Sequence, residues 1–170
     1  MARPLDSIAD RMTSSPDPEP TIRLADAGDA EAVARCVNAA FEPYIERIGK
    51  PPAPMLLDHP KLIRGGRVWV AEHRGRLAGV LVQYETDAGF YIDTVAVSPS
   101  LQGTGVGRAL LLFAEREARR RGFASIYLCT NSRMTENQRF YPKIGYVETE
   151  RRTEAGYDRI FYRKQLPRHL

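Results

Sequence analysis

The feature that most constrains the fold is a glycine-rich stretch between a strand and a helix, in residues 95–108. β-Branched residues lead up to Pro99, which cannot continue a sheet ladder, so a strand ends there. Glycines at 103, 105 and 107 follow, and the apolar run from Ala109 predicts a helix. Glycine can adopt positive φ, and the first turn of a helix leaves N–H groups unpaired. The stretch therefore predicts a cradle for a pyrophosphate; the alternative is a structural turn that binds nothing.

Two familiar nucleotide-binding loops do not fit this stretch. It lacks a Gly-Lys-Ser/Thr ending, which excludes the phosphate loop of nucleotide hydrolases. The dinucleotide fingerprint needs another glycine spacing and an acidic residue at the end of a suitable later strand, and neither is present. The stretch instead resembles motif A of the GCN5-related N-acetyltransferases, the GNAT family, which reads Gln/Arg-x-x-Gly-x-Gly/Ala and is here Gln102, Gly105 and Gly107.

A second match to the same family follows the first along the chain. Residues 131–145 resemble motif B, carried here by Asn137, Tyr141, Gly145 and Tyr146. The resemblance covers roughly residues 21–166 and implies an α/β fold. That fold has a mixed, mostly antiparallel sheet of six to seven strands with splayed central strands, flanked by about four helices. We expect one domain over residues 20–168, preceded by a flexible leader over residues 1–19.

Hydrophobic periodicity gives an element order that agrees with this fold. Strands are predicted at 21–24, 68–72, 77–84, 90–97, 125–130 and 157–165, and a further strand is predicted to start at 145–148. Helices are predicted at 30–37, 43–49, 60–63, 105–121 and 135–143. In the longest helix, Glu115 and Glu117 stand four residues before Arg119 and Arg121, which predicts two surface ion pairs.

Composition limits the classes of partner. The net charge of +4 and pI of 9.2 arise largely from arginine clusters such as 119–121 and 151–152, and no nucleic-acid motif accompanies them. No apolar run reaches membrane-spanning length, and the first twenty residues carry no secretory signal. Cys36 and Cys129 predict buried, reduced thiols, and the three histidines show no metal-ligand spacing. We expect a cytoplasmic protein without nucleic acid, membrane or metal; the family makes a homodimer plausible.

The resemblance implies that the cofactor is acetyl-coenzyme A (acetyl-CoA). In the family, the strand before motif A binds the pantetheine arm and the glycine loop binds the pyrophosphate through its backbone amides. Matching positions in this chain are Val95, Ala96, Val97, Gln102, Gly103, Thr104, Gly105, Val106, Gly107, Arg108, Asn137 and Tyr141. Gln102 is expected to brace the loop, and Arg108 is expected either to meet a phosphate or to remain an ordinary surface arginine.

Acetyl transfer to an amine needs a base, an oxyanion donor and an acid. The resemblance implies Tyr141 as the acid beside the coenzyme sulfur and the N–H of Val95 or a neighbour as the oxyanion donor. Asp93 is a carboxylate within an otherwise apolar strand and is the candidate base, with a structural acceptor or a water chain as the alternatives. Tyr91 and Cys129 stand where several relatives carry glutamate, a departure from the family pattern.

The acceptor site is expected to have aromatic walls. Candidates are Phe41, Tyr44, Tyr84 and Tyr91, with Glu42 or Glu46 available for a cationic acceptor. The resulting hypothesis is an N-acetyltransferase that moves an acetyl group from acetyl-CoA to a primary amine of a small molecule or peptide by direct attack. The alternatives are an acetyl-CoA-binding sensor or regulatory module without turnover, and a binder of nucleic acid or phosphoprotein through the arginine clusters.

Overall fold

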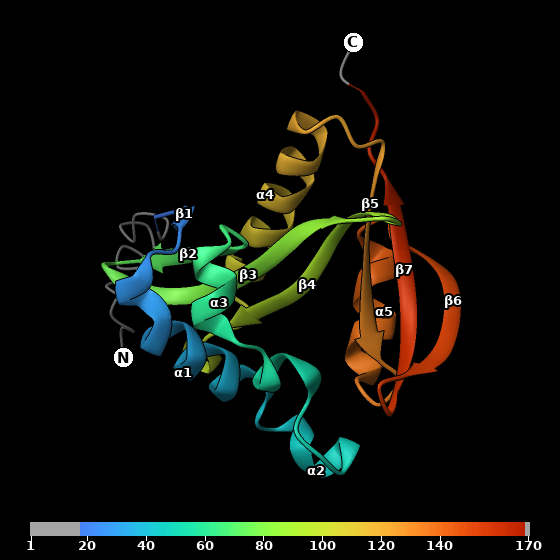
Figure 1. Ribbon diagram of the computed structural model, residues 1–170, viewed down its shortest axis with the longest axis horizontal. Coiled ribbons are helices and arrows are strands. Elements are labelled where there is room, and N and C mark those ends of the chain that lie inside the picture. Colours follow the sequence, from blue (N-terminus) through green and yellow to red (C-terminus); the bar gives the residue numbers. More distant parts are fainter. Residues whose placement is uncertain (1–17, 169–170) are drawn as a thin grey trace, which may run out of the picture.

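The chain folds around a seven-stranded sheet in the order β1-β2-β3-β4-β5-β7-β6, seen in a computed structural model that describes residues 18–168 (Figure 1). All neighbouring strands are antiparallel except β4 and β5. The strands are β1 (Thr21–Leu24), β2 (Val68–His73), β3 (Arg76–Thr86), β4 (Gly89–Val97), β5 (Ser125–Asn131), β6 (Val147–Glu154) and β7 (Tyr157–Gln165). The helices are α1 (Ala30–Phe41), α2 (Tyr44–Ile48), α3 (His59–Arg64), α4 (Val106–Arg120) and α5 (Thr135–Lys143).

These elements confirm the α/β architecture predicted from the sequence, and most bounds agree within two residues. One predicted helix is longer than expected, because α1 continues to Phe41. The strand expected to start within residues 145–148 begins at Val147 and ends at Glu154. The predicted leader, residues 1–19, lies outside the described residues except for its last two positions.

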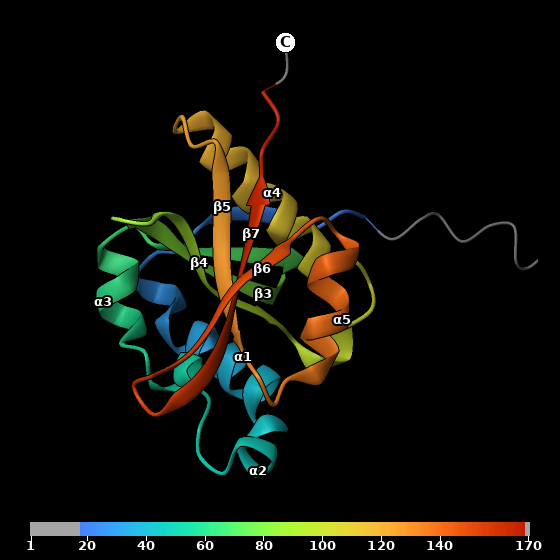
Figure 2. The same cartoon turned by 90° about the vertical axis from the view of Figure 1, so that its right-hand side faces the viewer.

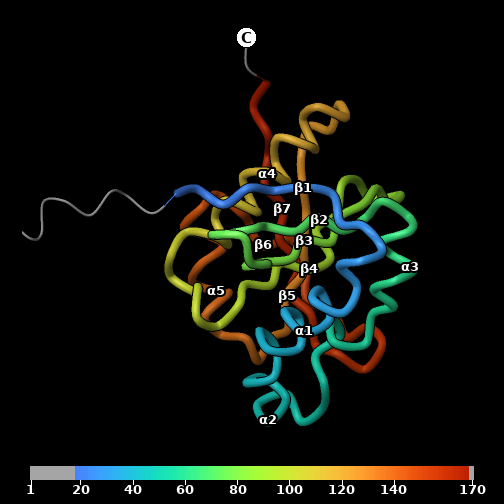
Figure 3. The backbone as a smooth tube through the Cα atoms, turned by 90° about the vertical axis from the view of Figure 1, so that its left-hand side faces the viewer, coloured from blue at the N-terminus to red at the C-terminus, as the bar shows by residue number. Residues whose placement is uncertain are grey.

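Alternation along the strands produces an apolar core on each face of the sheet. In β2, Trp69 and Ala71 pack with α4, whereas Val68 and Val70 pack with α1 and α3 on the other face. Figures 1 and 3 show α4 on the opposite side of β1–β4 from α1. Figure 2 shows the β6–β7 hairpin in front of the other strands, with α5 along one side and α2 below.

One predicted ion pair is wrong. Glu115 was expected to pair with Arg119 on the surface of α4. Instead, Glu115 is buried, with only 3% of its surface exposed, and its carboxylate lies 2.5 Å from Lys164 Nζ on β7. The other predicted pair, Glu117 with Arg121, is present at 3.5 Å. Helical spacing gives the distance along the helix but does not show which neighbours a long side chain reaches across the core.

The sheet divides between β4 and β5. These parallel strands pair at only three positions, Phe90–Ile92 with Ile126–Leu128, although β4 continues to Val97 and β5 to Asn131. Beyond that point β5 follows β7, with which it pairs along its whole length. Figure 1 shows the two parts of the sheet diverging. The expected splayed central strands are therefore present, and they leave the second half of β4 without a neighbour on this side.

Candidate active site

A cleft of about 720 Å³ lies where the two parts of the sheet separate. Its walls come from α1 and α2, the loop that follows them, β4, β5, α5 and the β6–β7 hairpin. We call one part the glycine end, formed by Val95–Val97, Gln102 and Gly107. The other part, the charged end, contains Asp93, Glu150, Arg152, Glu154 and Arg159.

The glycine end is shaped by backbone geometry. Gly103 and Gly105 have φ values of 80° and 98°, which side-chain-bearing residues rarely adopt. Gly107 is helical, and a Cβ added there would lie 3.4 Å from Val97 Cγ2, so its lack of a side chain allows α4 to approach β4. The first intrahelical bond of α4 runs from Ala109 N to Gly105 O, so the preceding amides have no acceptor within the helix. These amides and the helix dipole suit an anion.

The open edge of β4 supplies further backbone groups to the glycine end. Ser98 N donates to Ala78 O at 2.8 Å, so the N–H of Ser98 points toward β3. Because backbone groups alternate in direction along a strand, the N–H groups of Val95 and Val97 point the other way, toward the divide. The Gln102 side-chain amide donates to Val97 O at 3.3 Å and so braces the loop against β4.

The predicted coenzyme residues do not all reach the cleft. Seven of them line it: Val95, Ala96, Val97, Gln102, Gly107, Asn137 and Tyr141. Val106 is buried in the core beneath α4, so only its backbone could meet a ligand. The remaining four, Gly103, Thr104, Gly105 and Arg108, are exposed in the turn and first helical residues, outside the cleft lining.

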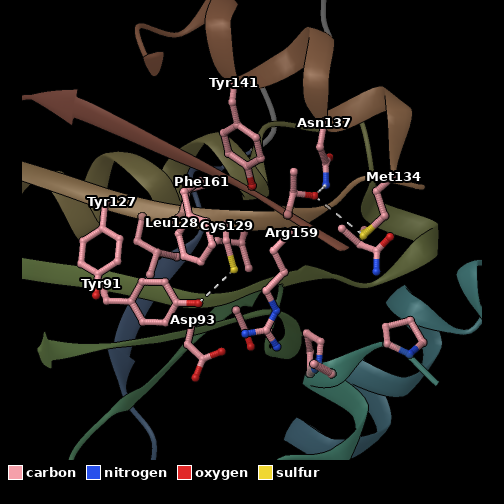
Figure 4. Close-up of a pocket in the computed structure, with 18 of the residues that line it drawn as sticks. Tyr91, Asp93, Tyr127, Leu128, Cys129, Met134, Asn137, Tyr141, Arg159 and Phe161 are labelled. Atoms are coloured by element: carbon pink, nitrogen blue, oxygen red, sulfur yellow. Dashed lines mark hydrogen bonds between the residues drawn. The ribbon is translucent and has the colours of Figure 1, made fainter. Parts of the chain in front are cut away.

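Helix α5 places Tyr141 over the divide. Its ring packs against Tyr146 and Tyr162 at centroid distances of 5.5 and 5.8 Å, and its hydroxyl is directed into the cleft (Figure 4). Burial raises the pKa of this hydroxyl above its ordinary value, which keeps it protonated. One turn earlier, Asn137 Nδ2 donates to Thr130 Oγ1 at 2.9 Å and ties α5 to β5.

A β-bulge directs Asp93 into the cleft. Val82 of β3 pairs with Thr94 and Gln83 pairs with Ile92, which leaves Asp93 without an opposite residue. Tyr84 donates its hydroxyl proton to Asp93 Oδ2 at 2.7 Å. Burial raises the pKa of the Asp93 carboxyl, and this hydrogen bond opposes the rise. A carboxyl with a raised pKa is a stronger base than an ordinary carboxyl, which suits Asp93 to accept a proton from a ligand in the cleft.

The four predicted acceptor residues, Phe41, Tyr44, Tyr84 and Tyr91, all line the cleft. Tyr91 stacks on Tyr127 at 4.8 Å, and its hydroxyl lies 3.3 Å from Cys129 Sγ (Figure 4). Cys129 lines the cleft and is half-buried, rather than fully buried as expected. The carboxylates proposed for a cationic acceptor, Glu42 and Glu46, are exposed and outside the cleft lining.

Sequence reasoning missed the residues that the last two strands contribute. By alternation, Tyr157, Arg159, Phe161 and Arg163 of β7 share the face that lines the cleft. Their partners on β6 are Glu154, Arg152 and Glu150, which pair with Tyr157, Arg159 and Phe161. The sequence did contain a signal for Arg159. Alternation along the last strand places this charged residue between Tyr157 and Phe161 on one face, which could have marked it as a site residue.

Helix α2 and the segment that follows it close one side of the cleft. Lys50 Nζ donates to Gly156 O at 2.6 Å and lies 4.0 Å from the centroid of the Tyr157 ring. Tyr157 in turn donates its hydroxyl proton to Pro51 O at 2.5 Å. We call residues 44–54 the strap, because these contacts fasten it to the β6–β7 turn.

Other classes of site find little support in the described residues. Within residues 18–168, no group of three or more His, Cys, Asp or Glu could hold a metal ion, and no helix is long and apolar enough to cross a membrane. Most of the arginines in the predicted clusters are paired with acids: Arg120 and Arg121 with Glu117, Arg151 with Glu148, and Arg152 with Glu150 and Glu154.

Comparisons with known proteins place this geometry in a family. The sequence profile described as "Acetyltransferase (GNAT) domain" matches residues 64–148, half of the 170 residues. No curated protein sequence matches the chain.

Solved structures share the fold at low identity. A GCN5-related N-acetyltransferase from Rhodopseudomonas palustris is 22% identical, with a TM-score of 0.72 over 88% of this chain and 98% of its own. YncA from Salmonella typhimurium, with its cofactor acetyl-CoA, is 22% identical, with a TM-score of 0.66 over 90% and 97%. The ribosomal-protein-S18-alanine N-acetyltransferase from Escherichia coli is 19% identical, with a TM-score of 0.68 over 88% and 96%.

The profile runs from β2 to the start of β6 and therefore includes the glycine turn, the bulged strand and α5. These are the elements that build the glycine end and place Asp93 and Tyr141 in the cleft. This chain belongs to the GNAT family of acetyltransferases.

Proposed function

We propose that this protein is an N-acetyltransferase that transfers the acetyl group of acetyl-CoA to a primary amine of a small molecule or peptide by direct attack. The observation that carries the proposal is the shared cleft, in which a glycine end suited to an anion and a carboxyl with a raised pKa lie close together along β4, facing Tyr141 of α5 across the divide in the sheet. YncA of S. typhimurium holds acetyl-CoA in the same fold, and the R. palustris and E. coli proteins are N-acetyltransferases.

The residues of the glycine end fit the coenzyme. The amides at the start of α4 would hold the pyrophosphate, and the open edge of β4 at Val95 and Val97 would pair with the amide groups of the pantetheine arm. Gln102 holds the loop against Val97 O. The coenzyme supplies the activated acetyl group, as a thioester.

The charged end and α5 supply the proton transfers. Asp93 takes a proton from the ammonium group of the acceptor, directly or through water, and the freed nitrogen lone pair attacks the thioester carbon. The N–H of Val95 donates to the oxygen on which negative charge develops. The carbon–sulfur bond then breaks as Tyr141 gives its proton to the departing thiolate. The high pKa of Tyr141 keeps this proton available at neutral pH. The attacking nitrogen loses its second proton, through water, to the Tyr141 phenolate, and Asp93 releases its proton to solvent.

Calorimetric titration with acetyl-CoA, followed by a screen of primary amines, tests the proposal. The wild-type protein should bind acetyl-CoA and release free coenzyme thiol in the presence of an amine. Tyr141→Phe should lower turnover by about 10²-fold or more, because it removes the acid, and should leave coenzyme affinity near that of the wild type.

Tyr146→Phe is the matched control. Its ring lies in the same aromatic cluster, but its hydroxyl is buried without a hydrogen-bond partner among the described residues, and it does not line the cleft. Loss of that hydroxyl should leave turnover unchanged. Failure to bind acetyl-CoA would contradict the proposal, and binding without turnover on any amine would indicate the sensor or regulatory module instead.

A further inference from the structure

We propose that the acceptor is a small zwitterion whose amine lies at Asp93 and whose carboxylate pairs with Arg159, as in an amino acid. This inference rests on the proposed acetyl transfer and adds the chemical class of the acceptor. It depends on three features of the charged end: the position of Arg159, its incomplete neutralisation and the closure of the cleft by the strap.

The register of β7 places Arg159 in the cleft. It lies opposite Asn131 on β5 and Arg152 on β6, between the inward-facing Tyr157 and Phe161. Its side chain is only 20% exposed. Figure 4 shows Arg159 from β7 and Asp93 from β4 extending toward the same part of the cleft. A long cation with an apolar stem and aromatic neighbours is thus held beside the candidate base.

Arg159 is only partly neutralised by its surroundings. Within residues 18–168 its one ion pair is with Glu154, at 3.5 Å, and it donates no hydrogen bond to another residue. Glu154 is 45% exposed and already accepts a hydrogen bond from Arg152 Nε at 3.0 Å. Glu150 is bound to Arg152 as well. The guanidinium therefore keeps paired N–H donors, the arrangement that binds a carboxylate in a bidentate manner.

Asp93 and Arg159 are separated by a space that a ligand can bridge. They interact electrostatically, since Arg159 lowers the pKa of the Asp93 carboxyl, yet they form no ion pair within 4.0 Å in the described part of the chain. An ammonium group beside Asp93 and a carboxylate beside Arg159 would satisfy both charges at once. An acceptor with an amine alone would leave the half-buried Arg159 with Glu154 as its only ion-pair partner among the described residues, and so would lose the binding free energy of a second carboxylate contact.

The strap favours a small acceptor. Lys50 and Tyr157 join the strap to the β6–β7 turn, and Arg47 Nη1 contacts both carboxylate oxygens of Glu136 on α5 at 2.8 Å. These contacts hold the strap across the side of the cleft that is next to the charged end. A folded protein presenting a lysine would have to displace them, whereas a molecule the size of an amino acid would not.

The test compares the twenty common α-amino acids with their carboxamides, which keep the amine and lose the negative charge. Acetylation is measured as release of free coenzyme thiol at saturating acetyl-CoA. The wild-type protein should acetylate at least one amino acid with a kcat/KM roughly 10- to 100-fold above that of its amide, the range expected for one charge-assisted contact. Arg159→Met should remove this preference by lowering kcat/KM for the acid only, and Arg159→Lys should restore part of it.

Arg163→Met is the matched control from the same face of β7. Its guanidinium is already bound to Ser125 Oγ at 2.8 Å and to Ala88 O at 2.9 Å, so the variant should change acid and amide by the same factor. Amides acetylated as well as their acids, or an Arg159→Met variant that slows both equally, would overturn the inference and leave acetyl transfer standing. Acetyl-CoA binding with no acetylation of any amino acid or amide, but with turnover on other amines, would also overturn it. No turnover on any amine would overturn acetyl transfer itself.

Discussion

At the glycine end of the cleft, the groups suited to a ligand are backbone amides from one continuous stretch, Val95 to Gly107. At the charged end they are side chains from β4, β6 and β7, brought together by strand register across the divide. The first arrangement depends on backbone conformation, because glycines allow the positive φ angles of the turn and the helix N-terminus leaves its first amides unpaired. The second depends on residue identity at a few positions.

This difference indicates how the two ends divide the proposed work. Backbone amides recognise a phosphate or an amide group whatever the neighbouring side chains are, which suits a common coenzyme. Side chains such as Asp93 and Arg159 can change without altering the fold, which suits a particular acceptor. Substitutions at the two ends should therefore have different effects. Those at the glycine end should change coenzyme affinity alone, and those at the charged end should change acceptor binding or the chemical step alone.

The largest effect is expected from Asp93→Asn at the charged end. Turnover should fall by about 10²- to 10⁴-fold, the usual contribution of a general base, while acetyl-CoA affinity stays the same. The pH–rate profile of the wild type should lose activity as the pH falls through the raised pKa of Asp93, because the protonated carboxyl cannot accept a proton. The matched control is Asp87→Asn, an exposed acid in the turn before β4, which should stay within about twofold of wild type.

Asp93→Asn should lower turnover but raise the stability of the folded protein at high pH. Burial raises the pKa of folded Asp93 above its unfolded value, so its stabilising contribution is present at low pH and is lost as the pH rises through the folded pKa. Asp93→Asn removes this loss. The melting temperature of the variant minus that of the wild type should therefore be larger at pH 8 than at pH 4. An equal difference at both pH values would mean that Asp93 is not protonated preferentially in the folded protein.

An intermediate effect is expected from Gly105→Ala at the glycine end. Both Gly105 and Gly122 have positive φ, 98° and 87°, and a Cβ at either position meets no atom within 4 Å. The two alanine variants should therefore lose similar stability, about 1–2 kcal/mol. Only Gly105→Ala should weaken acetyl-CoA binding, by roughly 10-fold, since the strained turn shifts the amides that follow it. Equal coenzyme affinity in the two variants would make the glycine turn a structural feature only.

The smallest effect is expected from Lys50→Met in the strap. The substitution removes the hydrogen bond to Gly156 O and the contact with the Tyr157 ring. Looser closure should raise KM for the acceptor by about two- to fivefold and leave coenzyme affinity unchanged, because the strap lies at the charged end. Lys61→Met on α3, also a lysine-to-methionine change but on the exposed surface, should change neither constant. A change in coenzyme affinity for Lys50→Met would show that the two ends are coupled.

The sequence by itself determined the features that depend on neighbours along the chain. The glycine turn, the strand before it and the helix after it follow from residues 95–120, because backbone conformation and helix capping are local properties. Alternation in residues 91–97 predicts that Tyr91, Asp93, Val95 and Val97 share one face, and this prediction is wrong. Val95 and Val97 pack against the α4 core, whereas Tyr91 pairs with Tyr84, which packs against the α1 core, because the bulge at Asp93 shifts the alternation by one residue. The two motifs in order were sufficient to identify the family.

Only the tertiary structure decided which distant residues meet. Arg159 enters the cleft because β7 pairs with both β5 and β6, and Glu115 binds Lys164 rather than Arg119 because α4 packs against that sheet. The bulge that directs Asp93 into the cleft is a mismatch between β3 and β4, which neither strand shows alone. Such contacts arise from strand register and packing between segments far apart in sequence. The acceptor side of the cleft is therefore the part of this protein that its sequence predicted least well.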